Sequence, residues 1–144
     1  KVDGPNHIKV VEEFGYEMYL HCGAIRKVLL AYQSPSFIEE YVKKIIEHDH
    51  AFPRVDAGDL RDELKKIRQS GYAITYGEYV NDAVGIGAPV FNSEGELAGS
   101  IGIIAPTIRL NSEELLKVQL EYVQKFAADL SRDIGYSPLF SSRA

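Results

Sequence analysis

Apolar side chains recur at two different spacings along this chain, and the spacing changes near residue 72. Before that point they recur every three or four residues, which predicts helices. The first covers residues 23–32; the second is capped by Ser34, has Pro35 in its first turn and ends by 48–52. A third begins at Asp59 and ends at Gly71. Ahead of them, the β-branched stretch 7–14 predicts a strand, with residues 16–20 as its hairpin partner.

From residue 72 onward, β-branched and small residues alternate, which predicts strands over 72–79, 83–91 and 96–105. A short turn at 92–95 joins the last two strands, and so short a connection requires antiparallel pairing. A final helix is expected from an Asn111 cap to Gly135. Its apolar stripe comprises Leu116, Leu120, Val123, Ala127, Leu130 and Ile134. The fold class is therefore α+β, with helices packed on an antiparallel sheet.

Composition restricts the function classes. The 144 residues suit one domain, and a single cysteine excludes a disulfide scaffold. No apolar run approaches the ~20 residues that span a bilayer, so we expect a cytoplasmic protein without membrane contact. A net charge of −5 without a basic cluster argues against nucleic-acid binding by this chain itself. Because the chain starts at Lys1 rather than Met, we expect a fragment or a processed product.

The strands 83–91 and 96–105 have one face that is almost free of side chains. Their period of two separates the apolar Val84, Ile86, Ile101 and Ile103 from an opposite face with small residues. If Gly85 lies opposite Gly102, this second face becomes a glycine floor. Such a floor accepts either a ligand or a closely packed backbone, from a helix or a neighbouring subunit. Beside it, the helix start at 22–25 offers free amide groups to an anion.

Catalytic groups are scarce. Cys22 could act as a nucleophile with His21, and Glu78 as a base, but a buried inert thiol is the favoured interpretation of Cys22. His48 and His50 flank Asp49 without a further ligand cluster that would complete a metal site. No phosphate-binding loop, catalytic triad or paired-cysteine motif is present in the sequence. We therefore expect no enzyme activity, no cofactor and no metal.

Three separated segments resemble the effector-binding domain of the IclR-family transcriptional regulators. Residues 20–31 (LHCGAIRKVLLA) resemble the family segment LHxTAxGKALLA, and residues 64–73 (LKKIRQSGYA) resemble its L..IR..GYA segment. Gly77 and Glu78, followed by residues 86–92 (IGAPVFN), Gly95, Ile101 and Pro106, are similar to its GE…IAAPVFD..G core. The segments occur in the family's order and at similar spacing over residues 20–110.

The resemblance implies a fold like GAF and profilin-like sensor domains, a curved antiparallel sheet with flanking helices. It implies that residues 1–144 sense a small organic effector and contribute to a homodimer or homotetramer. DNA would be bound only by an N-terminal winged helix-turn-helix domain that is absent from this chain. The competing interpretations are a pure dimerisation domain without ligand, and a small enzyme using Cys22, His21 or Glu78.

The resemblance also places the effector beside the first helix, on the glycine face of the sheet. The implied contacts are Ala24, Ile25, Thr75, Ala83, Gly85, Gly102 and Ile104, and the free amides of the helix start add Cys22 and Gly23 as candidate contacts. Relatives that sense glyoxylate-like acids carry Gly and Ala where this chain has Ala24 and Ile25. They carry Asp, Cys, Ser and Ser at the positions of Thr75, Gly85, Gly102 and Ile104. Because most of those polar groups are missing here, we expect an effector larger than glyoxylate, aromatic acids included. Arg26 replaces the family's glycine and could bind a carboxylate, although a surface acid is its more ordinary partner.

Overall fold

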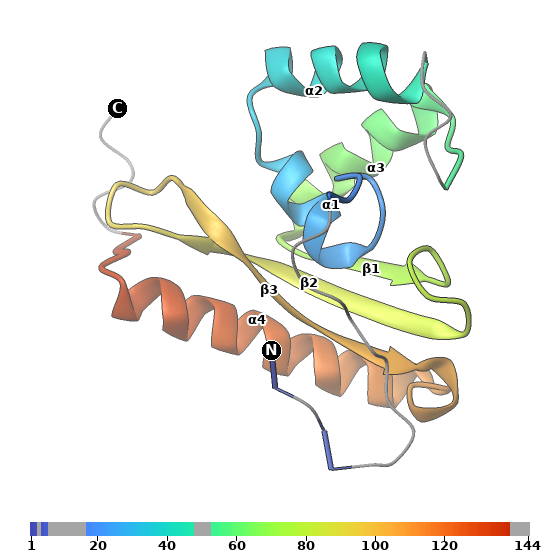
Figure 1. Ribbon diagram of the computed structural model, residues 1–144. Helices are drawn as coiled ribbons and strands as arrows, with labels where there is room; N and C mark the ends of the chain where they lie inside the picture. Colours follow the sequence, from blue (N-terminus) through green and yellow to red (C-terminus); the bar gives the residue numbers. More distant parts are fainter. Residues whose placement is uncertain (3, 6–16, 48–52, 139–144) are drawn as a thin grey trace.

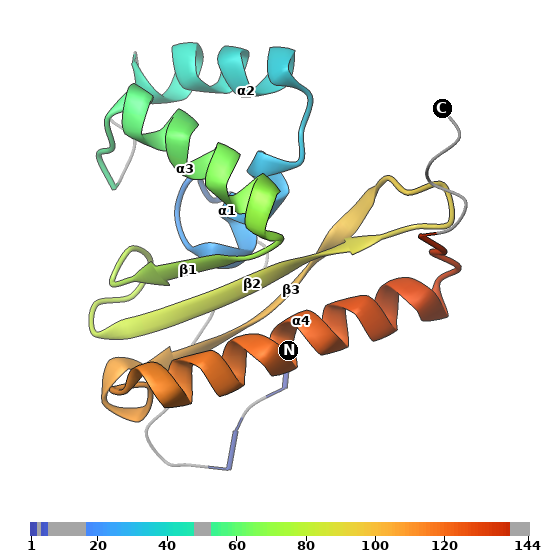
Figure 2. The ribbon, with the colours of Figure 1, turned by 180° about the vertical axis from the view of Figure 1, so that it is seen from behind.

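A three-stranded antiparallel sheet lies between two layers of helices in the computed structural model, which describes residues 1–2, 4–5, 17–47 and 53–138. Helix α1 packs on one face of the sheet, with α2 and α3 beyond it on the same side, and α4 covers the other face (Figures 1 and 2). This arrangement confirms the α+β class. The elements are α1 Ala24–Ala31, α2 Pro35–Tyr41, the π-helical turn η1 Val42–Ile46, α3 Ala57–Ser70, β1 Ala73–Tyr76, β2 Ala83–Phe91, β3 Leu97–Pro106, the 3₁₀ turn η2 Thr107–Arg109 and α4 Glu113–Asp133.

The structure does not confirm the strand and hairpin partner predicted for the N-terminal residues. The strand expected at 7–14 lies outside the described residues, as do 48–50. The hairpin partner expected at 16–20 is wrong for its described part, because residues 17–20 form no strand and Leu20 begins a turn. A loop and turn there lead directly into α1, and they place Cys22 and Gly23 against Glu78, which follows β1 in the chain.

Helix caps are set by side chains close to the predicted ones. Ser34 caps α2 as expected, since its hydroxyl accepts a hydrogen bond from the Phe37 amide. The α3 cap is Asp56 rather than Asp59: its Oδ1 accepts from two amides of the first turn, at 2.7 and 3.0 Å. Likewise Ser112, not Asn111, caps α4. Both predicted caps lie within one helical turn of the observed ones, because neighbouring polar residues can take the same cap position.

Two apolar layers hold the sheet in place. One joins α1, α2 and α3 above the sheet, around Val28, Leu30 and Leu60, all at most 1% exposed. The other joins the sheet to α4 through Val84, Ile86 and partners that include Val123 and Ala127. Within the described residues, no helix combines the length and apolar character needed to cross a membrane.

The apolar stripe predicted for α4 is correct only in its first four members. Leu130 and Ile134 are 41% and 44% exposed, so the last two members of the stripe lie outside the core. Ser131 takes the inward position instead, one turn after Ala127. Its hydroxyl donates to the Ala127 carbonyl and accepts from the Phe91 amide, at 2.7 and 3.0 Å. A backbone amide of β2 thus finds its partner on α4, which favours a serine there.

The pairing of β2 with β3 differs from the one considered in the sequence analysis, in which Gly85 lies opposite Gly102. Gly87, not Gly85, lies opposite Gly102, and Gly85 lies opposite Ile104. A bulge at Val90/Phe91 shifts the pairing beside the turn. The strand predicted at 72–79 is shorter, because Gly77 adopts a positive φ of 63° and starts the loop that leads to β2. The separation of the two faces is as predicted.

Helix α1 packs directly on the glycine face. A Cβ atom on Gly87 would lie 3.0 Å from the backbone of Ala24 and Ile25, and one on Gly102 would lie 2.7 Å from Cγ1 of Ile25. Ser100 donates a hydrogen bond to the Ile25 carbonyl at 2.9 Å. Most of the glycine floor is therefore covered by a helix, and only the part around Gly85 is left open.

This packing predicts that Gly102→Ala destabilises the fold by about 2 kcal/mol, because overpacking forces the backbone to shift. The new methyl group would overlap the Ile86 carbonyl oxygen of the neighbouring strand. Gly99→Ala on the same strand is the matched control, since nothing lies within 4 Å of its added methyl group. Urea unfolding of both variants measures the difference. Equal stability of the two would contradict the close packing of α1 on β3.

Candidate functional site

A cavity of about 80 Å³ opens between the start of α1, the strands β1 to β3 and the loop 77–82. One wall is the first turn of α1, the floor is sheet, and the loop forms the rim. Its lining comprises Gly23, Ala24, Ile25, Arg26, Thr75, Gly77, Glu78, Tyr79, Val80, Ala83, Gly85 and Ile104. Most of this surface is apolar, and the polar groups concentrate at the α1 end.

The structure brings together seven of the nine residues expected to contact an effector. Cys22 and Gly102 do not line the cavity. Cys22 is buried, at 3% exposure, and Gly102 lies beneath the Ile25 side chain. The additional lining residues come from the loop 77–82 and from Arg26. The sequence suggests Arg26 as a carboxylate ligand and Glu78 as a base, each on its own. Only the fold shows that the loop 77–82 forms the rim of the cavity.

The first turn of α1 presents unused backbone donors. Its first intrahelical bond is donated by the Lys27 amide to the Gly23 carbonyl, and no side chain in the described part of the protein caps the amides of Ala24, Ile25 and Arg26. The Gly23 amide donates to Oε2 of Glu78 at 3.0 Å. The helix N-terminus therefore carries partial positive charge at the cavity wall, and a side-chain carboxylate already occupies one of its donors.

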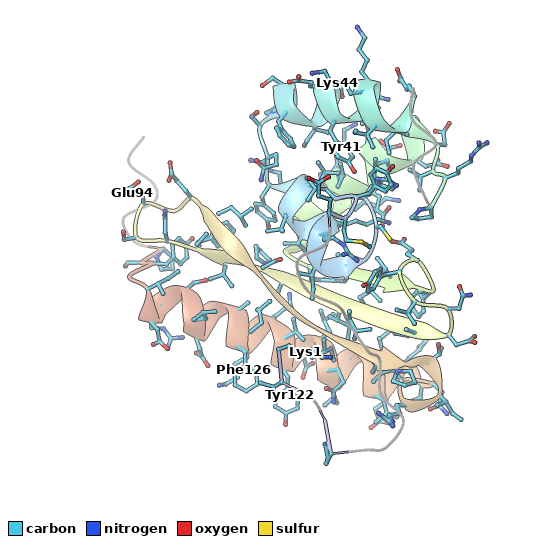
Figure 3. All side chains as sticks on the ribbon, in the orientation of Figure 1. Lys1, Tyr41, Lys44, Glu94, Tyr122 and Phe126 are labelled. Atoms are coloured by element: carbon cyan, nitrogen blue, oxygen red, sulfur yellow. The ribbon has the colours of Figure 1, made fainter. Side chains whose placement is uncertain are left out.

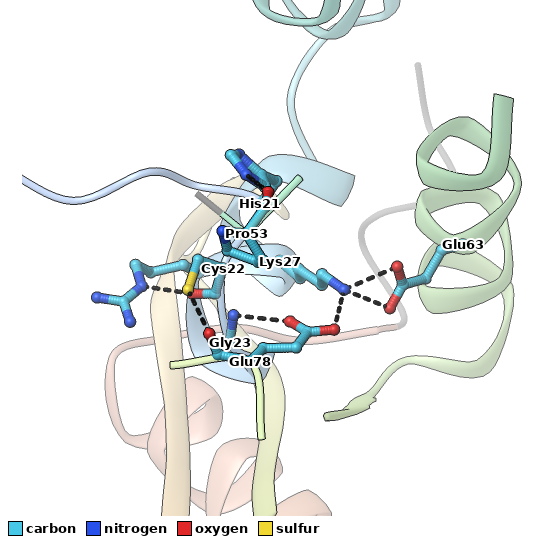
Figure 4. Close-up of polar contacts among 8 residues, drawn as sticks. His21, Cys22, Gly23, Lys27, Pro53, Glu63 and Glu78 are labelled. Carbon is cyan, nitrogen blue, oxygen red and sulfur yellow. Dashed lines mark hydrogen bonds and ion pairs between the residues drawn. The ribbon is translucent and has the colours of Figure 1, made fainter. Parts of the chain in front are cut away.

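A buried lysine connects this helix with its surroundings (Figure 4). Lys27 is 1% exposed, and its ammonium group lies 2.8 Å from both oxygens of Glu63 and 2.5 Å from Oε1 of Glu78. Glu63 belongs to α3 and Glu78 to the loop 77–82. The ammonium thus links three segments. Its burial was not predicted, although position 27 shares the inward helix face of Ala24, Val28 and Ala31.

Arg26 lies against Tyr79 at the cavity rim. Its Nε donates to the Cys22 carbonyl at 2.6 Å, and its guanidinium carbon lies 4.3 Å from the Tyr79 ring centroid. Within the described residues, no carboxylate forms an ion pair with Arg26. The stacked guanidinium therefore retains donors for an anion.

Thr75 contributes a hydroxyl group from β1. The residue is 5% exposed, and no residue of the described structure forms a hydrogen bond with its side chain. Its Oγ1 would lie 3.0 Å from a Cβ on Gly85, which has none. Glycine at position 85 therefore keeps open the space between this hydroxyl and α1. Because no fully buried side-chain polar atom of the described residues lacks a hydrogen-bond partner, this hydroxyl reaches the cavity, where it is available to a polar ligand group.

Cys22 and His21 do not form a catalytic pair. The Cys22 thiol donates to the Glu78 carbonyl at 3.3 Å, and burial raises the pKa of this thiol. His21 is fully buried between the Tyr41 hydroxyl, 2.8 Å from Nδ1, and the Pro53 carbonyl, 3.0 Å from Nε2. Both residues instead anchor the segment that precedes α1. Among the described residues, no group of three His, Cys, Asp or Glu side chains could hold a metal ion.

The Lys27 network predicts a loss of stability of about 2 kcal/mol in Lys27→Met. This loss of stability is smaller than the loss expected from breaking a fully buried ion pair, because Glu63 is partly exposed. The substitution keeps the apolar stem but leaves two carboxylates facing each other without a cation. Lys65→Met, which removes an exposed i,i+3 partner of Asp62, is the control and should change stability little. Chemical unfolding compares them, and a neutral Lys27→Met would contradict the linking role.

Burial of His21 predicts a pH dependence. Desolvation lowers the pKa of His21 below its ordinary value of 6.5, with Lys27 acting in the same direction and the Pro53 carbonyl and Glu78 opposing it. As the pH falls through the His21 pKa of the unfolded chain, the unfolded chain binds more protons than the folded protein does. The free energy of unfolding therefore decreases with decreasing pH, by at most about 1.4 kcal/mol per pH unit. Wild type should lose more stability between pH 7.5 and 5.5 than His21→Gln does. Identical losses in the two proteins would contradict this assignment.

Comparisons with known proteins agree with this architecture. The family model described as bacterial transcriptional regulator IclR C-terminal matches residues 1–132. The HTH-type transcriptional regulator KipR of Bacillus subtilis (strain 168) is 29% identical over 143 residues, covering 95% of this chain and 55% of KipR. The chain thus spans about half the length of such curated relatives.

Solved structures show the same fold. The Thermotoga maritima IclR structure aligns with a TM-score of 0.80 and 26% identity, covering 94% of this chain and 55% of that one. The inducer-binding domain of an Acinetobacter PobR double mutant, in complex with 3-hydroxybenzoic acid, aligns with a TM-score of 0.72 and 20% identity. That alignment covers 90% of this chain and 73% of the PobR chain. Together with the family match, these similarities show that the chain belongs to the IclR family of transcriptional regulators and corresponds to their C-terminal domain, whose fold is GAF-like.

Proposed function

We propose that residues 1–144 are the effector-sensing domain of a DNA-binding transcriptional regulator, and that the cavity beside α1 binds a small organic acid. The observation that carries the proposal is the cluster of unused donors in this cavity. It consists of the α1 amides, the Arg26 guanidinium and the Thr75 hydroxyl. In the proposed full-length regulator, DNA contacts come from a winged helix-turn-helix outside these residues, in keeping with the net charge of −5.

The carboxylate of the acid is assigned to the α1 end of the cavity. There the helix dipole and Arg26 both favour a negative charge. Glu78 weakens this preference only in part, because its charge is partly offset by the Gly23 amide and by Lys27, which Glu63 shares. A hydroxyl or carbonyl group on the acid would reach Thr75. The remaining wall of Ala83, Ile104 and Val80 suits a short aliphatic part.

The size of the cavity restricts the effector further. Ile25 fills the space above Gly102, so replacing polar residues by glycine there has not opened a wide pocket. An apolar cavity of about 150 Å³ admits benzene, and the cavity here has about 80 Å³. Short-chain acids larger than glyoxylate therefore fit best. An aromatic acid requires the loop 77–82 to move outward.

Sensing would work through a population shift. A ligand that binds one arrangement of the oligomer more tightly than another changes their ratio, by no more than its differential affinity. The acid would contact α1 and the loop 77–82, which Glu78 and Lys27 connect to α3. This connection gives a physical route from the cavity to the outer helices. We place no chemical step at the site, since Cys22 and His21 are held by other partners.

The test is thermal unfolding with a panel of acids: glyoxylate, pyruvate, short branched and straight-chain hydroxy and oxo acids, and benzoates. Each acid is paired with its neutral amide. A ligand at about a hundred times its dissociation constant stabilises the fold by about 2.7 kcal/mol. We expect stabilisation by short acids larger than glyoxylate, and little effect from the amides because Arg26 and the helix dipole select a charge.

Two variants locate the binding site. Thr75→Val removes the hydroxyl at constant shape, and Arg26→Met removes the cation; both should weaken the stabilisation by the active acid. Thr107→Val, outside the cavity, is the control and should leave the response unchanged. A folded protein that responds to no acid would contradict the sensor and favour a pure dimerisation domain. Consumption of an acid with loss of turnover in Cys22→Ala would instead favour the enzyme.

A further inference from the structure

The side chains of Arg26 and Tyr79 form a stacked pair at the rim of the cavity. The guanidinium carbon of Arg26 lies 4.3 Å from the centroid of the Tyr79 ring, and both residues line the cavity. A Cβ atom on Gly23 would lie 3.5 Å from Nη2 of Arg26 and 3.6 Å from Cβ of Tyr79. The pair therefore packs against the residue that precedes α1, next to the uncapped amides of its first turn.

Both members of the pair are held by the segment that leads into α1. Nε of Arg26 donates a hydrogen bond to the Cys22 carbonyl at 2.6 Å. Glu78, which directly precedes Tyr79, accepts a hydrogen bond from the Gly23 amide at 3.0 Å and another from the Cys22 thiol at 3.3 Å (Figure 4). The backbone that carries the Tyr79 ring is thus tied to the start of α1, and the fold sets the place of the ring beside Arg26.

Tyr79 limits the space in the cavity. It carries the largest apolar side chain among the lining residues, whereas the sheet contributes small residues such as Ala83 and Gly85. The opposite wall is fixed, because Ser100 and Lys27 hold α1 on the sheet and on α3. The cavity has about 80 Å³, and a cavity that admits benzene has about 150 Å³. Since the Tyr79 side chain is itself an aromatic ring, its removal would free about the space that the ring of a benzoate needs.

Tyr79 also determines how Arg26 is presented to a ligand. An aromatic ring attracts a cation through its π face and, unlike a carboxylate, does not cancel the charge. Within the described residues, Arg26 has no carboxylate partner and the Tyr79 hydroxyl forms no hydrogen bond, so the contact uses the ring face. A guanidinium that is already held in place loses less conformational entropy when an acid binds. The stack therefore favours a carboxylate over a neutral group at the α1 end of the cavity.

We propose that Tyr79 is the residue that determines which acids the cavity accepts. Its ring closes the cavity to ring-sized acids such as benzoates, and it holds the Arg26 guanidinium in position for the carboxylate of a short aliphatic acid. This inference rests on the proposed acid site and assigns the selectivity of that site. Tyr79 acts on size as part of the wall and on charge only through Arg26, which makes it a positioning residue for the cation.

The first test exchanges the size preference. Dissociation constants for 2-hydroxybutyrate, a short aliphatic acid, and for benzoate are measured by NMR titration of the 144-residue chain. The wild type should bind 2-hydroxybutyrate more tightly than benzoate. Tyr79→Ala should bind benzoate about tenfold more tightly than the wild type does, and 2-hydroxybutyrate more weakly. Opposite shifts of the two affinities cannot result from a general loss of structure.

Tyr122→Ala is the matched control for the size preference, because Tyr122 lies on α4, on the opposite side of the sheet from α1 (Figure 3). It removes the same ring and should leave both affinities unchanged. If the wild type binds 2-hydroxybutyrate but Tyr79→Ala gains no affinity for benzoate, the role of Tyr79 is wrong and the acid site stands. A wild type that prefers benzoate contradicts that role as well. If the wild type binds neither acid, the acid site and this inference both fail.

The second test isolates the contact with Arg26. It compares Tyr79→Phe, which keeps the ring face, with Tyr79→Leu, which keeps an apolar side chain without a ring. The readout is the ratio of the affinities for 2-hydroxybutyrate and for its neutral amide, which a purely structural effect would not change. Tyr79→Phe should keep the wild-type ratio, and Tyr79→Leu should lower it about two- to fivefold through loss of the cation–π contact. Equal ratios in the two variants, or the same drop when Tyr79→Leu is made in an Arg26→Met background, would overturn the positioning role.

Discussion

The buried Lys27 ammonium is the interaction on which the arrangement of α1 depends. A charge at 1% exposure is costly unless it is paired, and two carboxylates from different segments pair it here. Because Glu63 lies on α3 and Glu78 on the loop 77–82, the position of α1 is fixed relative to both. Glu78 also accepts from the Gly23 amide, which fixes the start of the helix.

The position of α1 determines the cavity. The helix covers Gly87 and Gly102 so closely that little but glycine fits beneath it, whereas Gly85 still borders the cavity. The uncapped amides of the helix, Arg26 and Thr75 border the same cavity. Close packing and the proposed ligand binding therefore use the same glycine face and are not alternatives. The helix covers most of the face, and the cavity beside it is small and lined with unused donors.

Much of the fold could be predicted because its signals are local. The two faces of β2 and β3 follow from alternation, and Ser34 and Gly71 bound their helices by cap chemistry that neighbouring residues decide. The resemblance supplied the effector region, and Ala24, Thr75 and Gly85 do meet there. The register was less predictable, since a single bulge at Val90/Phe91 changes which glycines lie opposite each other.

Interactions between distant segments could not be predicted in the same way. Lys27 meets Glu63 and Glu78 across 36 and 51 residues of chain, and no spacing in the sequence indicates that encounter. The only signal was a lysine on the inward face of an apolar helix. Leu130 and Ile134 continue the spacing of Val123 and Ala127, and periodicity alone does not show which members of such a stripe a neighbouring element covers.

The central claim is that the α1 end of the cavity binds the carboxylate of a small acid. The most direct measurement is an amide-resolved NMR titration of the ¹⁵N-labelled chain with the acid that stabilises it most. The account predicts saturable shifts of the Ala24, Ile25 and Arg26 amides together with Gly85, while the signals of the α4 amides change little. Shifts confined to other segments, with those four amides unmoved at saturation, would contradict the account.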